Sequence, residues 1–149
     1  MEGKERIMTY EVGNYLEHQV ASATPGQLIE MLYDRAVRDL KSAYEFFSLQ
    51  GDPSSQADAI RSIVHAQQIV AELNHSLNFK EGGDLARNLA RIYEYVQFRL
   101  MEAVQKRDQA PVVEVAELMS ELHEAWKTML EEQAKSVTKA LSGAGTLVA

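Results

Sequence analysis

The sequence predicts an all-α protein, an antiparallel up-down-up-down four-helix bundle with an N-terminal arm. Apolar residues recur at a spacing near 3.6, and short breaker segments divide the chain into four such stretches. No stretch shows the alternating pattern of a half-buried strand. We therefore expect a partly ordered arm at residues 1–23, a bundle at 24–141 and a disordered tail at 142–149.

The first predicted helix runs from residue 24 to about residue 50. Thr24 can cap its N-terminus, Pro25 suits the first helical position, and Gln27 can complete a capping box. Gly51 is a typical residue just after a helix end. The apolar residues of this segment form one stripe, which is expected to face the core: Ile29, Leu32, Ala36, Leu40, Ala43 and Phe47.

The second predicted helix covers about residues 53–77 and is capped by Asp52, with Pro53 in its first position. The short junction before it predicts that it returns antiparallel to the first helix. Its apolar sector is very broad, because Ala57, Ile60 and Val64 lie beside the main stripe. This breadth indicates a central helix, or one that borders a second apolar surface.

Two further helices are predicted after Gly82-Gly83, with Asp84 as the cap of the third and Pro111 near the start of the fourth. The core stripe of the third helix contains Leu85, Leu89, Ile92, Tyr93, Val96, Leu100 and Ala103. The stripe of the fourth contains Val115, Leu118, Met119, Leu122, Trp126, Met129 and Leu130, and it continues to Val137 and Leu141. The fourth helix can therefore overhang the bundle, and Gly143 and Gly145 are expected to end it.

A surplus of apolar residues is the most informative feature for function. Tyr95, Phe98 and Met101 project away from the core stripe of the third helix. Leu28 and Met31 add to the surplus in the first turns of the first helix. A groove for an apolar helix of another protein would explain this surface. Homodimerisation, or coverage by the chain's own arm, would explain it too.

The arm carries apolar side chains of its own, among them Tyr10, Tyr15 and Val20. Asn14 can cap a short helix that holds Tyr15, Leu16 and Val20. These residues precede the helix start at Thr24, so they cannot join the four-helix core in register. The hypothesis from sequence is that the arm covers part of the groove in the free protein and that a ligand displaces it.

Composition excludes several classes of function. The 149 residues carry 22 acidic and 15 basic side chains, a formal net charge of −7 that disfavours nucleic-acid binding. The chain has no cysteine, which removes disulfides, thiol catalysis and zinc-thiolate sites. No apolar run approaches the ~20 residues of a membrane span, and the charged N-terminus does not look like a signal peptide. We expect a cytoplasmic protein.

No catalytic residue, cofactor site or metal site is predicted. A carboxylate-bridged di-metal bundle would need two Glu-x-x-His motifs, but the chain has one, Glu72 to His75. Glu72 and His65 also fall on the polar sector of the second helix. We therefore predict a protein that is not an enzyme. The di-metal enzyme remains an alternative, as does a structural homodimeric bundle or adaptor.

The chain resembles the flagellar export chaperone FliS, a flagellin-specific secretion chaperone. The resemblance lies in Tyr15, Val20, Ser22-Ala23-Thr24-Pro25, Leu28-Ile29, Leu32-Tyr33-Asp34, Glu72 to Asn78, Gly82-Gly83, Tyr93-Glu94-Tyr95 and Trp126-Lys127. Two positions depart from the family pattern: Val12, where many relatives have a tyrosine, and Val104, where an asparagine is frequent.

This resemblance implies a partner and a mechanism. The partner is the C-terminal segment of flagellin, which is disordered when free and folds as it wraps the bundle. Binding prevents premature polymerisation and delivers flagellin to the flagellar type III export gate. We expect a monomer or weak homodimer without a cofactor. The residues predicted to bind flagellin are Tyr10, Tyr15, Val20, Leu28, Met31, Tyr95, Phe98 and Met101.

Overall fold

The computed structural model describes residues 21–49 and 51–148, with side chains placed as far as residue 143. It contains four long helices, and the described residues include no strand: α2 (Pro25–Ser48), α3 (Pro53–His75), α4 (Phe79–Lys106) and α5 (Ala110–Val148). The predicted all-α four-helix bundle is therefore confirmed. None of the described helices is long and apolar enough to cross a membrane.

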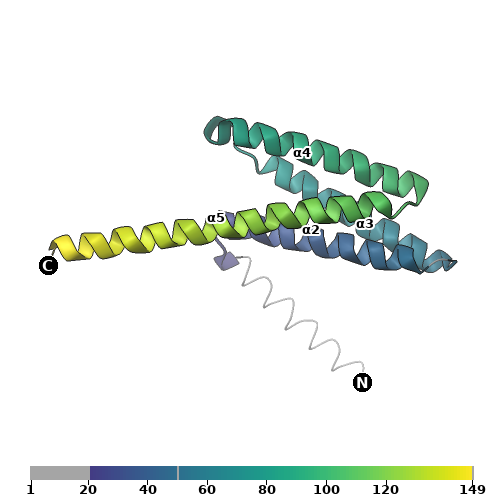
Figure 1. Ribbon diagram of the computed structural model, residues 1–149, viewed down its shortest axis with the longest axis horizontal. Coiled ribbons are helices and arrows are strands. Elements are labelled where there is room, and N and C mark those ends of the chain that lie inside the picture. The colour runs from purple at the N-terminus through teal and green to yellow at the C-terminus, as the bar shows by residue number, and fades with distance from the viewer. Residues whose placement is uncertain (1–20, 50, 149) are drawn as a thin grey trace, which may run out of the picture.

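The helices form a ring in which sequence neighbours are also spatial neighbours. α2 packs against α3 and α5, and α4 also packs against α3 and α5. α2 and α4 are therefore diagonally opposite. Figure 1 shows that α5 runs far past the ends of its partners, so that its C-terminal half projects from the bundle.

Local hydrogen bonds explain where the helices begin. Thr24 Oγ1 accepts from the Gln27 amide at 3.2 Å, and Gln27 Oε1 accepts from the Thr24 amide at 2.9 Å. This is the predicted capping box. Asp52 caps α3 by accepting from the Ser54 amide at 3.0 Å. Each cap satisfies backbone N–H groups that have no partner within the helix.

The core consists of one cluster of buried side chains from all four helices. At its centre the Tyr33 and Tyr93 hydroxyls, on α2 and α4, bond to each other. The remaining fully buried members include Leu40, Ile63, Val70, Leu73, Val96, Leu100, Val112, Val115 and Met119. Trp126 packs against this cluster while staying partly exposed, and its Nε1 donates to the Gly26 carbonyl at 2.9 Å.

The start of α4 differs from the sequence-based prediction. The helix begins at Phe79 rather than at Asp84, because Asn78 Oδ1 accepts from the Glu81 amide at 3.1 Å and caps an additional turn. Gly83 then has φ 51° and ψ −126°, which kinks the helix instead of ending it. A positive φ of this kind is easily adopted only by glycine. Leu85, predicted to be in the core, is 63% exposed just after this kink.

The end of α5 also differs from expectation. The helix continues through Gly143 to Val148. A glycine inside a helix costs only about 1 kcal/mol relative to alanine, which is not enough to end a helix that has no competing structure. Leu141 lies beyond the ends of the partner helices and is 68% exposed. The apolar stripe of α5 therefore extends beyond the core against which the helix packs.

Candidate protein-binding surface

The outward face of α4 carries the three large apolar side chains that the sequence pattern placed away from the core. Tyr95 is 44% exposed, Phe98 62% and Met101 50%. All three lie within two turns of one helix. Large apolar side chains left in water at neighbouring positions are typical of a surface that binds another protein.

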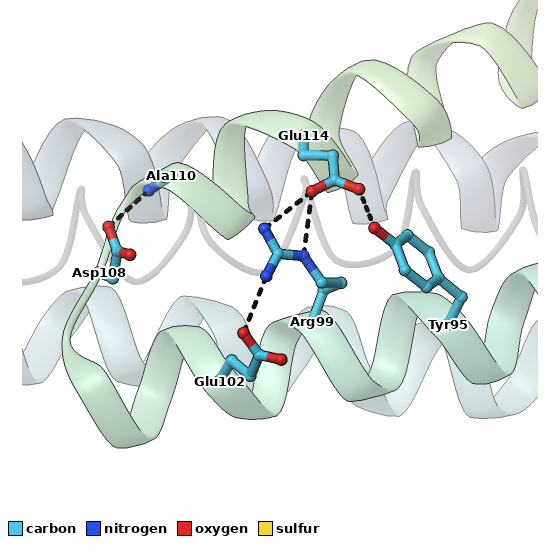
Figure 2. Close-up of polar contacts among 6 residues, drawn as sticks. All are labelled: Tyr95, Arg99, Glu102, Asp108, Ala110 and Glu114. Atoms are coloured by element: carbon cyan, nitrogen blue, oxygen red, sulfur yellow. Dashed lines mark hydrogen bonds and ion pairs between the residues drawn. The ribbon is translucent and has the colours of Figure 1, made fainter.

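Tyr95 is held in place by a polar network that joins α4 to α5 (Figure 2). Its hydroxyl donates to Glu114 Oε1. Arg99 binds the other oxygen of Glu114 through Nε at 3.0 Å and Nη2 at 2.8 Å, and its Nη1 reaches Glu102 Oε2 at 2.8 Å. Figure 2 shows the Tyr95 and Arg99 side chains converging on Glu114 from neighbouring turns of α4.

The network also fixes the charge states of its members. The hydrogen bond from Tyr95 lowers the pKa of Glu114, and the bonds from Arg99 act in the same direction. The same hydrogen bond raises the pKa of Tyr95, and the bond to Glu114 raises the pKa of Arg99. At neutral pH the network consists of an ionised carboxylate, a neutral phenol and a guanidinium cation. It anchors Tyr95 beside the more exposed side chains of Phe98 and Met101.

The apolar surface extends along the seam between α3 and α4. Gln97 Nε2 donates to the Gln67 carbonyl at 2.8 Å, which fixes the level at which the two helices meet. Val64 lies one turn before Gln67 and is 42% exposed. Towards the N-terminus of α4 the seam opens into a hollow of about 420 Å³, lined by Val70, Ala71, Asn74, His75, Phe79, Ala90, Tyr93, Glu94 and Gln97.

A second apolar hollow, of about 510 Å³, lies at the end of the bundle where α2 and α4 begin. Its lining includes Ile29, Tyr33, Leu77, Leu85, Ala86, Leu89, Tyr93, Trp126 and Met129. The sequence pattern missed this feature because it assigned Leu85 and Trp126 to core stripes. The hollow lies where the apolar stripes of α4 and α5 reach the end of the bundle, next to the Gly82-Gly83 pair.

The structure does not gather all of the predicted flagellin-binding residues. Leu28 and Met31 are half-buried on α2, diagonally across the bundle from α4, so they do not extend the Phe98 surface. Tyr10, Tyr15 and Val20 lie outside the described residues, as does the predicted position of the arm. The binding role of all eight residues stays a prediction.

The histidines of the described region have structural contacts. His123 is buried, stacks on Tyr33 with 6.3 Å between ring centroids, and lies 3.3 Å from Glu30 Oε1. His65 pairs with Asp39 of α2. Within residues 21–49 and 51–148, no three His, Asp or Glu side chains come together as a metal site.

Comparison with known proteins identifies the family. The model of the family described as "Flagellar protein FliS" matches residues 8–133. The chain belongs to the FliS family. It is 38% identical over 112 residues to the flagellar secretion chaperone FliS of Salmonella typhimurium, covering 75% of this chain and 81% of the relative. It is 28% identical over 121 residues to that of Bacillus subtilis, covering 81% and 86%.

The family match includes most of the arm and all four helices up to residue 133. The relatives are named as flagellar secretion chaperones. The outward face of α4, the α3–α4 seam and the hollow at the bundle end therefore all lie within the part of the chain that the family model matches. The projecting part of α5, from Ala134 onwards, lies beyond the family model.

Proposed function

We propose that this protein is a cytoplasmic export chaperone that binds the disordered C-terminal segment of flagellin. Binding keeps flagellin from polymerising prematurely and delivers it to the flagellar export gate. Membership of the FliS family, matched over residues 8–133, carries this proposal. The relatives' name, flagellar secretion chaperone, supports the export role.

The surface chemistry suits such a ligand. Segments that fold on binding bury apolar side chains along an extended path and give up conformational entropy as they order. The outward face of α4 offers Phe98 and Met101, and the seam with α3 offers Val64 and Phe79. Methionine is an adaptable contact for a helical ligand, since its side chain is flexible and polarisable. The chemistry requires no catalytic group.

A titration tests the proposal directly. The synthetic C-terminal segment of the flagellin from the same bacterium is added to the protein in a calorimeter, and the same samples are followed by circular dichroism. We expect saturable binding with a gain in helical signal, because the ligand folds on the bundle. A scrambled peptide of equal composition is the control. Absence of binding by the native segment would overturn the proposal.

Size-exclusion chromatography with light scattering distinguishes this chaperone from a structural homodimer. A chaperone should elute as a monomer or weak dimer and shift to a complex when the flagellin segment is added. A homodimer whose mass does not change with the segment would support the structural role instead. Pull-down of the chaperone–flagellin complex, but not of free flagellin, by the cytoplasmic part of the export gate would support delivery.

A further inference from the structure

Beyond Leu130, which contacts Gly26 of α2, the projecting part of α5 presents an apolar stripe that is largely exposed. Leu130, Ala134, Val137 and Leu141 follow one another at spacings of four, three and four, so they share one face. This face continues an apolar stripe of α5, of which Met119 and His123 are buried in the core. Val137 is 58% exposed and Leu141 68%. The charged residues Glu131, Glu132, Lys135 and Lys139 occupy other sides of the helix.

The stripe forms one wall of a groove at the N-terminus of α2. α2 and α5 touch where Gly26 meets Leu130, closely enough that a methyl group on Gly26 would lie 2.7 Å from the leucine side chain. Beyond this contact a hollow of about 840 Å³ opens, lined by Thr24, Gln27, Glu30, Lys127, Leu130, Glu131, Gln133, Ala134, Val137 and Thr138. We call this hollow the α5 groove.

The arm joins the bundle at the edge of this groove. Ala21 and Ser22 have helical backbone and connect through Ala23 and Thr24 to the first turn of α2. Twenty residues precede Ala21, and among them Asn14 can cap a helix that carries Tyr15, Leu16 and Val20. A helix from Tyr15 to Ser22 is about 12 Å long, and the α5 stripe from Leu130 to Leu141 is about 18 Å long. Such a helix is short enough to lie along the stripe.

We propose that the N-terminal arm of the same chain packs as a short helix in the α5 groove, with Leu16 and Val20 against Ala134 and Val137. The tether favours this occupant, because a segment joined by a few residues has an effective concentration in the millimolar range. A second copy could use only a short stripe of four residues, two of them small or medium in size. Such a contact is well below the ~1,200 Å² that a stable interface buries.

This position differs from the one expected from the sequence, where the arm was placed over the outward face of α4. Tyr95 contacts α5 at Glu114, whereas the first turn of α2, to which the arm is joined, contacts α5 at Leu130. About 24 Å of helix axis separates these two levels. The proposed arm helix, about 12 Å long, does not by itself span that distance. The α5 groove lies at the arm's point of attachment.

Disulfide trapping tests the inference, because the chain has no cysteine of its own. The variant Leu16→Cys/Val137→Cys should form an intramolecular disulfide on mild oxidation at least tenfold faster than Leu16→Cys/Lys139→Cys. Val137 and Lys139 lie at nearly the same level of α5 but on opposite faces, so the second variant is a matched control. Non-reducing electrophoresis and intact mass separate intramolecular from intermolecular bridges.

Each outcome bears on the inference. Equal rates in the two variants would overturn it, since the arm would not discriminate between faces of α5. A bridge that forms only between two molecules would overturn it as well and would assign the groove to a second copy. Hydrogen exchange on chains without added cysteine provides an independent check: Val137→Asp should speed exchange in residues 14–20 at least fivefold, whereas Lys139→Asp should not. None of these measurements depends on flagellin binding.

Discussion

Phe98→Ala is the sharpest test of the surface on α4. A phenylalanine side chain has roughly 200 Å² of accessible surface, and Phe98 is 62% exposed, so about 120 Å² of it remains in contact with water. Covering this area at about 25 cal/mol per Å² would stabilise a complex by about 3 kcal/mol. Interface anchors of this type commonly contribute 2 kcal/mol or more. The substitution should therefore weaken flagellin binding by roughly 30-fold to 150-fold.

The same substitution should hardly affect folding, because most of the ring is already in water. We expect the free energy of unfolding to fall by less than about 1 kcal/mol. Leu49→Ala is a matched control, since Leu49 is 56% exposed at the end of α2, diagonally across the bundle. Calorimetric titration measures the affinity, and urea unfolding measures the stability. An unchanged dissociation constant for Phe98→Ala would show that flagellin does not contact this face.

Three further changes test the packing. Trp126→Ala should lower the free energy of unfolding by about 3 kcal/mol in urea titrations, because the indole packs on the core and makes a hydrogen bond; a loss under 1 kcal/mol would contradict this. Burial raises the pKa of Tyr33 and Tyr93, so the unfolded state loses these protons first and stability should fall as pH rises above about 10. The variant Tyr33→Phe/Tyr93→Phe should lose this decrease in stability above about pH 10, because it has no phenol at either position. Thr24→Ala should cost about 1 kcal/mol of thermal stability through its cap, whereas Thr128→Ala on the exposed middle of α5 should cost nothing.

Features decided by neighbouring residues could be predicted from the sequence. The capping box of Thr24 and Gln27 depends on four consecutive residues, and the structure confirms it. The exposed face of α4 follows from helical periodicity alone, because Phe98 and Met101 lie opposite the stripe that contains Leu100. The antiparallel order of the helices could be predicted as well, because short loops allow only antiparallel neighbours.

Features decided by distant residues could not be predicted. Leu85 keeps the period of the α4 core stripe, but its exposure depends on the kink at Gly83 and on where the opposite helices end. The contact of Tyr95 with Glu114 joins two helices, and no spacing within α4 indicates it. Periodicity shows which face of a helix is apolar, whereas only the assembled bundle shows whether another helix covers that face.

The polar network between α4 and α5 bears on the proposed function, because it holds the outward face of α4 in place. Glu114 and Arg99 lock α4 to α5 beside Phe98, so the surface offered to a ligand is held rigid by contacts that are already present in the free protein. A preorganised surface loses little entropy on binding, and the ordering cost then falls on the flagellin segment alone. In the proposed complex, the cost of folding the ligand limits the affinity, while the site itself needs no rearrangement. In the proposed complex, Tyr95 acts mainly by positioning α4, and Phe98 and Met101 act by contact with flagellin.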